Sequence, residues 1–195
     1  MSALPEPADF ASPPGPADLG RWTEADRAAR PGRLIRVRER LAADGLDAYF
    51  GARPEHMRYL TGFTLADGEE KMAGDSGRFL VTADALVVLA DSRYTAQARR
   101  EAPEARIAFS YHDLPARWSE LLASIGARQV GVEAAFVSHA LWARLAEAAP
   151  DVELVPIEGW LEADRATKEP SEIERIAAAC AVADRALAGL LPAIR

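Results

Sequence analysis

Apolar positions between Gly32 and Trp160 follow two alternating patterns. Short apolar runs, typical of buried strands, alternate with longer stretches in which apolar positions recur every three or four residues, as on one face of a helix. Strands separated by helices predict an α/β layered domain, and the short connection at residues 83–85 predicts a β-hairpin, which makes the sheet mixed rather than purely parallel. The runs predict strands at residues 46–50, 78–82, 86–90, 106–109, 129–133 and 152–155, and the longer stretches predict helices at residues 33–41, 54–60, 92–101, 113–125 and 138–145.

The first 31 residues differ in composition from the rest of the chain, because six of the 13 prolines fall there among small residues. Such a stretch buries too little apolar surface to offset the entropy lost on ordering, so residues 1–31 are predicted to form a mobile tail. Thr23 and Asp26 have the form of a capping box and could start one helical turn, with Phe10 and Trp22 as anchors on the domain. A docking arm is therefore the alternative to a disordered extension.

A last amphipathic helix is predicted near the end of the chain. Ser171 and Glu174 have the spacing of a capping box before it, and Pro192 stands at its end. No sequence follows against which its apolar side could pack, so residues 165–195 are interpreted as a linker and the first helix of a second domain. The alternative is a helix that returns to the first core. The apolar stripe consists of Ile173, Ile176, Ala177, Cys180, Ala183, Leu187, Leu190 and Leu191.

Composition narrows the class of protein without naming a partner. The formal net charge of -7 and the pI near 5.1 argue against a dedicated nucleic-acid binder. The single cysteine, Cys180, excludes an internal disulfide and is expected to be a small buried apolar residue. No run of 18 apolar residues and no secretory signal are evident, so neither a membrane partner nor export is expected, and a cytoplasmic location is predicted.

Side chains that could carry out catalysis or bind a metal are sparse. His56, His112 and His139 are isolated in the sequence, without the spacing of metal ligands, and are interpreted as surface or interface histidines. The glycines form neither a dinucleotide-binding fingerprint nor a phosphate-binding loop, and no nucleophile elbow is present. The sequence therefore predicts no catalytic residue and no metal site in this chain.

Two local clusters are better candidates for binding. In residues 57–63, a tyrosine and a phenylalanine flank a turn-forming Thr-Gly pair. In the Asp-Ser-Arg-Tyr sequence at residues 91–94, Asp91 stands where a helix N-cap is expected, directly after an apolar strand. Arg93 offers a planar fork suited to a carboxylate, either of a neighbouring side chain or of a peptide terminus. The alternative is a capped helix with a surface ion pair.

The order of these segments resembles the amino-terminal domain of the creatinase/aminopeptidase P/prolidase family. The resemblance implies a ribonuclease H-like, three-layer α/β domain with a mixed sheet flanked by helices, over residues 32–164. It also implies a separate catalytic domain of "pita-bread" fold, which holds two divalent metals, commonly manganese, through two Asp, one His and two Glu. That ligand set has no counterpart in this chain. The matching segments are residues 33–41, 44–48, 58–63, 91–94, 130–133, 137–142 and 165–173.

The resemblance further implies a non-catalytic amino-terminal domain that contributes to oligomer assembly and to substrate access. The expected partners are a second copy of the protein and the catalytic domain, the latter through the helix at residues 171–191, and the loop at residues 65–77 is expected to reach a neighbouring subunit. Two alternatives remain: a free-standing binding or assembly module, and the amino-terminal domain of a creatinase-like amidinohydrolase. The residues predicted to make substrate-side or interdomain contacts are Tyr59, Phe63, Asp91, Arg93 and Tyr94.

Overall fold

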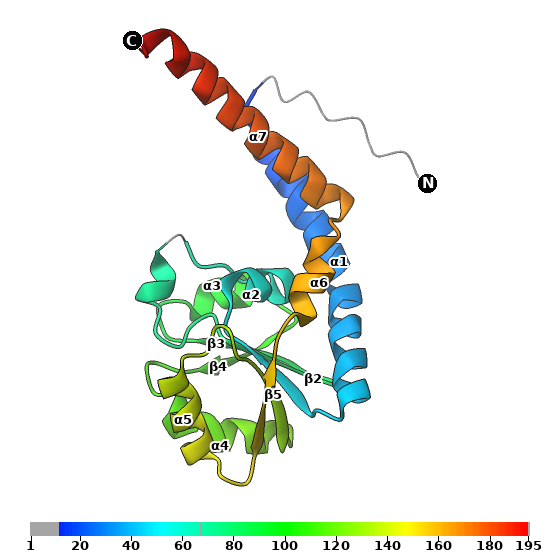
Figure 1. The fold of residues 1–195 in the computed structure, drawn as a ribbon, viewed down its shortest axis with the longest axis vertical. Coiled ribbons are helices and arrows are strands. Elements are labelled where there is room, and N and C mark those ends of the chain that lie inside the picture. Colours follow the sequence, from blue (N-terminus) through cyan, green and yellow to red (C-terminus); the bar gives the residue numbers. More distant parts are fainter. Residues whose placement is uncertain (1–11, 67, 195) are drawn as a thin grey trace. The chain divides into compact units, whose positions relative to one another are not determined.

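The computed structural model describes residues 12–66 and 68–194, and it divides the chain into two compact units. One unit is the continuous segment Arg30–Leu161. The other joins the two ends of the chain, Met1–Ala29 and Glu162–Arg195, of which residues 12–29 and 162–194 are described. Figure 1 shows the elements of both units.

A six-stranded mixed sheet forms the centre of Arg30–Leu161, in the order β4-β3-β2-β1-β5-β6. β2 runs antiparallel to both of its neighbours, whereas the pairs β1–β5, β5–β6 and β3–β4 are parallel. The predicted hairpin is confirmed, with Phe79 paired to Val88. The strands are β1 (Ala48–Gly51), β2 (Phe79–Thr82), β3 (Leu86–Ala90), β4 (Arg106–Phe109), β5 (Gln129–Glu133) and β6 (Glu153–Ile157).

Helices cover both faces of this sheet, as a three-layer α/β domain requires (Figure 1). On one face α2 (Pro54–Thr61) and α3 (Thr95–Glu101) pack against one apolar cluster, and on the other α4 (Leu114–Ile125) and α5 (His139–Ala148) pack against a second. Alternate residues of β1 enter the two clusters: Tyr49 the first and Phe50 the second. A short 3-10 helix, η1 (Glu69–Lys71), lies between α2 and β2.

The helix predicted at residues 33–41 begins much earlier than expected. α1 (Pro16–Asp44) runs without interruption through Pro31, so the part of the predicted tail from residue 16 onward is helical. The Asp18 carboxylate accepts a hydrogen bond from the Gly15 amide at 3.1 Å, and the alanine, arginine and glutamate residues of the helix have high helix propensity. The predicted helix start at Thr23 is wrong, because its Oγ1 donates to the Leu19 carbonyl inside the helix at 2.8 Å. Phe10 lies outside the described residues.

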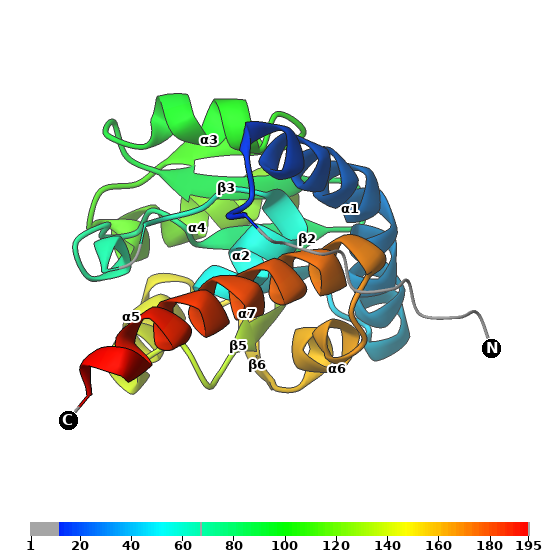
Figure 2. The same ribbon diagram turned by 90° about the horizontal axis from the view of Figure 1, so that it is seen from above.

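The other chain end forms α6 (Trp160–Ala166), which periodicity did not predict, then α7 (Pro170–Leu190) and the short η2 (Leu191–Ala193). α7 is one uninterrupted helix (Figure 2). Its capping box joins Glu169 and Glu172 rather than the predicted Ser171 and Glu174. The reason is Pro170, which occupies the first turn and so places the N-cap one residue before it.

The predicted apolar stripe of α7 is largely solvent-exposed, with Ile176, Leu187, Leu190 and Leu191 among the exposed large apolar side chains. The prediction of a buried Cys180 is wrong, since this residue lies on the exposed side of the helix. Contrary to the expectation from the sequence, Pro170–Ala193 is long and apolar enough to cross a membrane, by length and composition alone. A single helix of this kind is weak evidence, and the stripe is equally suited to a protein partner.

A candidate functional site at the carboxyl edge of the sheet

Polar side chains gather where the parallel strands of the sheet end. Because β1, β3, β4, β5 and β6 all run in one direction, their carboxyl ends meet at one edge. Asp91 follows β3, Ser110 follows β4 and Glu133 ends β5. β2 runs the other way, so Asp75 and Ser76, which precede it, reach the same edge. Ligands of open α/β sheets bind at this edge, which makes it the candidate site.

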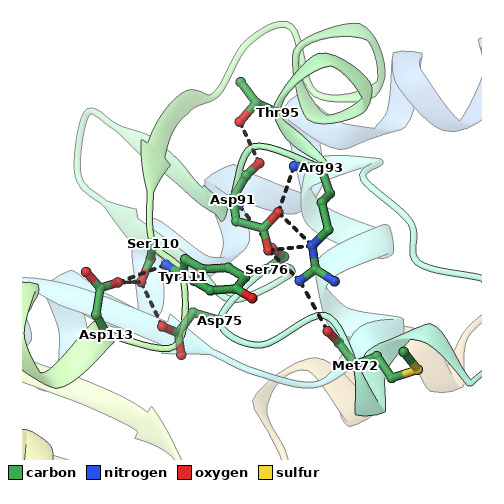
Figure 3. Close-up of polar contacts among 9 residues, drawn as sticks. All are labelled: Met72, Asp75, Ser76, Asp91, Arg93, Thr95, Ser110, Tyr111 and Asp113. Carbon is green, nitrogen blue, oxygen red and sulfur yellow. Dashed lines mark hydrogen bonds and ion pairs between the residues drawn. The ribbon is translucent and has the colours of Figure 1, made fainter.

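Asp91 and Arg93 form the central ion pair of the edge (Figure 3). The Asp91 carboxylate is fully buried and accepts from the Arg93 Nη2 at 2.7 Å and from the Arg93 backbone amide at 2.8 Å. The hydrogen bonds from the Arg93 side chain lower the pKa of Asp91, and they outweigh the burial of the carboxyl group, which acts in the opposite direction. Asp91 therefore holds its negative charge, and the arginine fork is already occupied by a neighbouring side chain.

The same pair ties the loop after α2 to the edge of the sheet. Arg93 Nη2 also donates to the Met72 carbonyl at 3.2 Å. Ser76 Oγ donates to Asp91 Oδ2 at 3.2 Å and accepts from the Asp91 amide at 3.1 Å. Since Met72 itself is 72% exposed, the loop is fastened through its backbone while the Met72 side chain points to solvent (Figure 3).

Asp75 makes a second link of the loop, to the start of α4. Its Oδ2 accepts from Ser110 Oγ at 2.8 Å and from the Leu114 amide at 2.9 Å, and it forms an ion pair with Arg78. The start of α4 is therefore held by Asp75, from a distant loop, and the side chain of Asp113, the residue directly before the helix, accepts from no amide of α4. The Asp113 carboxylate instead accepts from Arg117 and from the Tyr111 amide, which together lower its pKa.

Of the five residues predicted to make substrate-side or interdomain contacts, the structure pairs Asp91 with Arg93 and Phe63 with Tyr94. Phe63 is fully buried and packs edge-to-face on Tyr94, with ring centroids 6.4 Å apart. Tyr59 is buried, with the Arg33 guanidinium 4.1 Å from its ring centroid. Of the five, only Arg93, whose side chain is 44% exposed, offers a charged group to solvent. A role for any of the five in substrate contact stays a prediction.

A second polar cluster, around Glu133, was not predicted from the sequence. The Glu133 Oε1 accepts from the Tyr49 hydroxyl and contacts His56 Nδ1, while Oε2 accepts from the amides of Ala52 and Arg53 at 2.7 and 2.8 Å. Burial alone would raise the pKa of Glu133, but the hydrogen bonds from His56, Tyr49 and Ala52 outweigh it and lower the pKa. The prediction of a surface position for His56 is wrong, since it is 1% exposed.

The described residues do not fit a dinuclear metal centre. In residues 12–66 and 68–194, no three His, Cys, Asp or Glu side chains are grouped so that they could hold a metal ion. The acidic residues of the edge are engaged instead by arginines, hydroxyls and backbone amides. These internal hydrogen bonds and ion pairs anchor the loops of the edge to the sheet.

A mixed six-stranded sheet with one antiparallel strand, helices on both faces and a polar carboxyl edge defines an α/β domain of the creatinase amino-terminal type. The chain belongs to the Creatinase/Prolidase N-terminal domain family, whose model matches residues 33–167. A curated relative, the uncharacterised peptidase YqhT of Bacillus subtilis, is 26% identical over 159 residues, which are 82% of this chain and 42% of the relative.

Solved structures agree with this assignment. The Xaa-Pro dipeptidase from Bacillus anthracis has a TM-score of 0.74 at 23% identity, over 85% of this chain and 44% of that protein. The N-terminal domain of the cytoplasmic peptidase PepQ from Mycobacterium tuberculosis has a TM-score of 0.57 at 28% identity, over 68% of this chain and 97% of that domain. This chain is thus homologous to the N-terminal domains of Xaa-Pro peptidases, and it spans less than half the length of YqhT and of the dipeptidase.

Proposed function

We propose that this chain is the non-catalytic amino-terminal domain of an Xaa-Pro aminopeptidase or prolidase-like metallopeptidase. The match to the family over residues 33–167 carries the proposal. The solved relatives include an Xaa-Pro dipeptidase and an X-Pro aminopeptidase of Thermotoga maritima. As the resemblance to the family implies, we place the two divalent metals, commonly manganese, in a separate catalytic domain of pita-bread fold. PepQ is described as a cytoplasmic peptidase, and we propose the same location for this chain.

The role that we assign to the domain is oligomer assembly and control of substrate access. The loop at residues 65–77 suits this role, since Arg93 and Ser76 fasten it to the sheet edge while Met72 stays exposed. A loop held in this way presents a defined surface to a neighbouring subunit at little entropic cost on binding. The exposed stripe of α7 is the surface on which we place the catalytic domain. It equally favours the second candidate, a free-standing module that caps another protein through this helix.

Proline release tests the first part of the proposal. The purified chain, assayed with added manganese on an Xaa-Pro dipeptide and tripeptide, should show no turnover. Turnover that disappears on Arg93→Ala would overturn the proposal, because it would place a catalytic function in this chain.

A domain exchange tests the second part. Residues 33–167 replace the matching domain of the Bacillus anthracis dipeptidase, with and without shortening of the loop between Ala66 and Met72. The intact chimera should assemble and release proline, and the shortened one should hydrolyse longer peptides relative to dipeptides several-fold better. An unchanged ratio in a chimera that assembles normally would rule out a role of the loop in access.

A further inference from the structure

The sheet has a topological switch point between β1 and β5. These strands are parallel neighbours, but the helices that follow them lie on opposite faces. α2 follows β1 and places Met57 and Leu60 in the first apolar cluster, whereas α5 follows β5 and places Leu145 in the second. When the connections of two adjacent strands diverge in this way, a crevice opens outside their carboxyl ends, and ligands of open α/β sheets bind there.

A groove of about 620 Å3 lies at this switch point. Its volume is within the range of small-ligand sites, about 300–1,000 Å3. The β1–α2 connection and α2 form one side, the segment after α2 forms another, and the loop after β5 contributes an aromatic ring. The lining residues are Ala52, Pro54, Glu55, Arg58, Thr64, Leu65, Ala66 and Phe136.

Beside the groove, Glu133 accepts hydrogen bonds from the amides of Arg53 and of Ala52, which is a lining residue. These amides would otherwise receive an anionic ligand. Arg53 lies over the Phe136 ring at 4.7 Å and donates its Nε to Glu55 at 3.1 Å, so its charge is balanced by that carboxylate. Two lining residues of the groove, Phe136 and Glu55, are thus linked to each other through Arg53.

Arg58 supplies a second guanidinium, on the side of α2 that carries Glu55 three residues earlier. Within the part of the chain that the structure describes, no hydrogen bond or ion pair engages the Arg58 side chain. The nearby carboxylate of Glu69 accepts from the Ala66 amide at 2.9 Å and does not line the groove. The groove thus combines one uncompensated, planar fork with the apolar surfaces of Leu65 and Phe136.

We propose that this groove binds the carboxyl terminus of a peptide whose last residue is apolar. The Arg58 fork pairs with the terminal carboxylate, for which its geometry is suited. The last side chain lies against Phe136 and Leu65, which are otherwise partly or largely exposed to water. Nothing in this inference requires the catalytic domain, so it can fail or hold independently of the proposed peptidase assignment.

A matched pair of probes tests the proposal. N-acetylphenylalanine and N-acetylphenylalaninamide differ only in the charge of the terminal group, and binding of each to the full chain is followed by NMR chemical shifts. The acid should bind at least tenfold more tightly than the amide. Arg58→Gln should abolish that preference, Phe136→Ala should weaken both probes, and Arg144→Gln, at an exposed arginine of α5, should change neither.

With the two probes, the proposal would be overturned by equal binding of acid and amide, or by full binding of the acid to a folded Arg58→Gln protein. It would equally be overturned by no binding of either probe at 10 mM, roughly the weakest affinity that such a site would have. Tight binding of inorganic phosphate with displacement of the acid would also overturn it, because the groove would then be a general anion site. Unchanged thermal unfolding shows that each variant is folded. Arg58 and Phe136 have side chains that the solvent already reaches, so both of these variants are expected to fold.

Discussion

Glu133 is the residue whose replacement should cost the domain most at the sheet edge. Its two oxygens accept from four donors: the Tyr49 hydroxyl, His56 Nδ1 and the amides of Ala52 and Arg53. Glu133→Gln keeps the size of the side chain but turns one oxygen into a donor, which opposes two of these groups. At about 1.5–3 kcal/mol for each hydrogen bond to a charged group, the loss of two should lower the free energy of unfolding by about 3–6 kcal/mol.

Urea unfolding of the full chain, followed by circular dichroism and tryptophan fluorescence, measures this change. Glu153→Gln is the matched control, because Glu153 lies on the neighbouring strand β6 and its carboxylate accepts from the exposed Gln129 side chain. That substitution should cost less than about 0.5 kcal/mol. If the two variants unfolded within about 0.5 kcal/mol of each other, the reasoning on the Glu133 cluster would be refuted. Tyr49→Phe, which removes one donor, gives an intermediate value of about 1–2 kcal/mol.

The pH dependence of the same pair of proteins gives an independent check. The pKa of Glu133 is lower in the folded chain than its ordinary value of 4.5, so its contribution is fully present above that value. The contribution is lost as the pH falls through the lower, folded pKa. The difference in unfolding free energy between wild type and Glu133→Gln should therefore be constant from neutral pH down to the ordinary carboxyl range, and should shrink below it. A difference that grew on acidification would contradict the assigned direction.

Two further predictions concern α1 and its contacts. Gly62→Ala should destabilise the chain by about 2 kcal/mol more than Gly126→Ala. Both positions have positive φ, but only at Gly62 would the new Cβ overlap the Arg30 guanidinium. The urea midpoints of the two variants measure this difference. Trp22→Phe should reduce hydrogen-exchange protection in the first turns of α7 and leave protection of the sheet unchanged, because it removes the 2.8 Å hydrogen bond from Trp22 Nε1 to Glu174. Unchanged protection of α7 would show that this bond does not hold the helix.

The sheet was predictable because its signals are local. Each strand is a short apolar run, and the hairpin follows from the brief connection at residues 83–85. The six strands and their mixed sheet are confirmed. Asp91 and Arg93 were found for the same reason, since they stand two residues apart and their pairing needs only one turn of backbone.

The Glu133 cluster could not be found in this way. Glu133 and His56 are 77 residues apart, and only the parallel pairing of β1 with β5 brings them together. Asp75 and Leu114 present the same difficulty, because the helix cap comes from a loop 39 residues earlier. A polar residue at the end of a buried strand is a usable signal of such a cluster, but its partner depends on strand order, which periodicity does not give.

The helix errors have a different origin. The proline content of residues 1–31 predicts a tail, but Pro16 and Pro31 act through their positions. At the first turn a proline costs no hydrogen bond, and a single internal proline can be tolerated in a long helix whose remaining residues favour it. The cap of α7 was predictable by the same rule, because Pro170 in the first turn assigns the N-cap to Glu169.

The acidic residues of the carboxyl edge serve the structure of the domain. Asp75, Asp91 and Glu133 are each satisfied by partners from other elements, so none is available to a substrate without breaking internal hydrogen bonds. These three acids hold the loop before β2 and the turn before α2 in place. Both binding roles proposed above therefore use groups that this anchoring leaves exposed, which are Arg58 in the groove and Met72 of the loop. Substitutions at these two positions should therefore change binding without changing stability, and substitutions at the three acids should do the reverse.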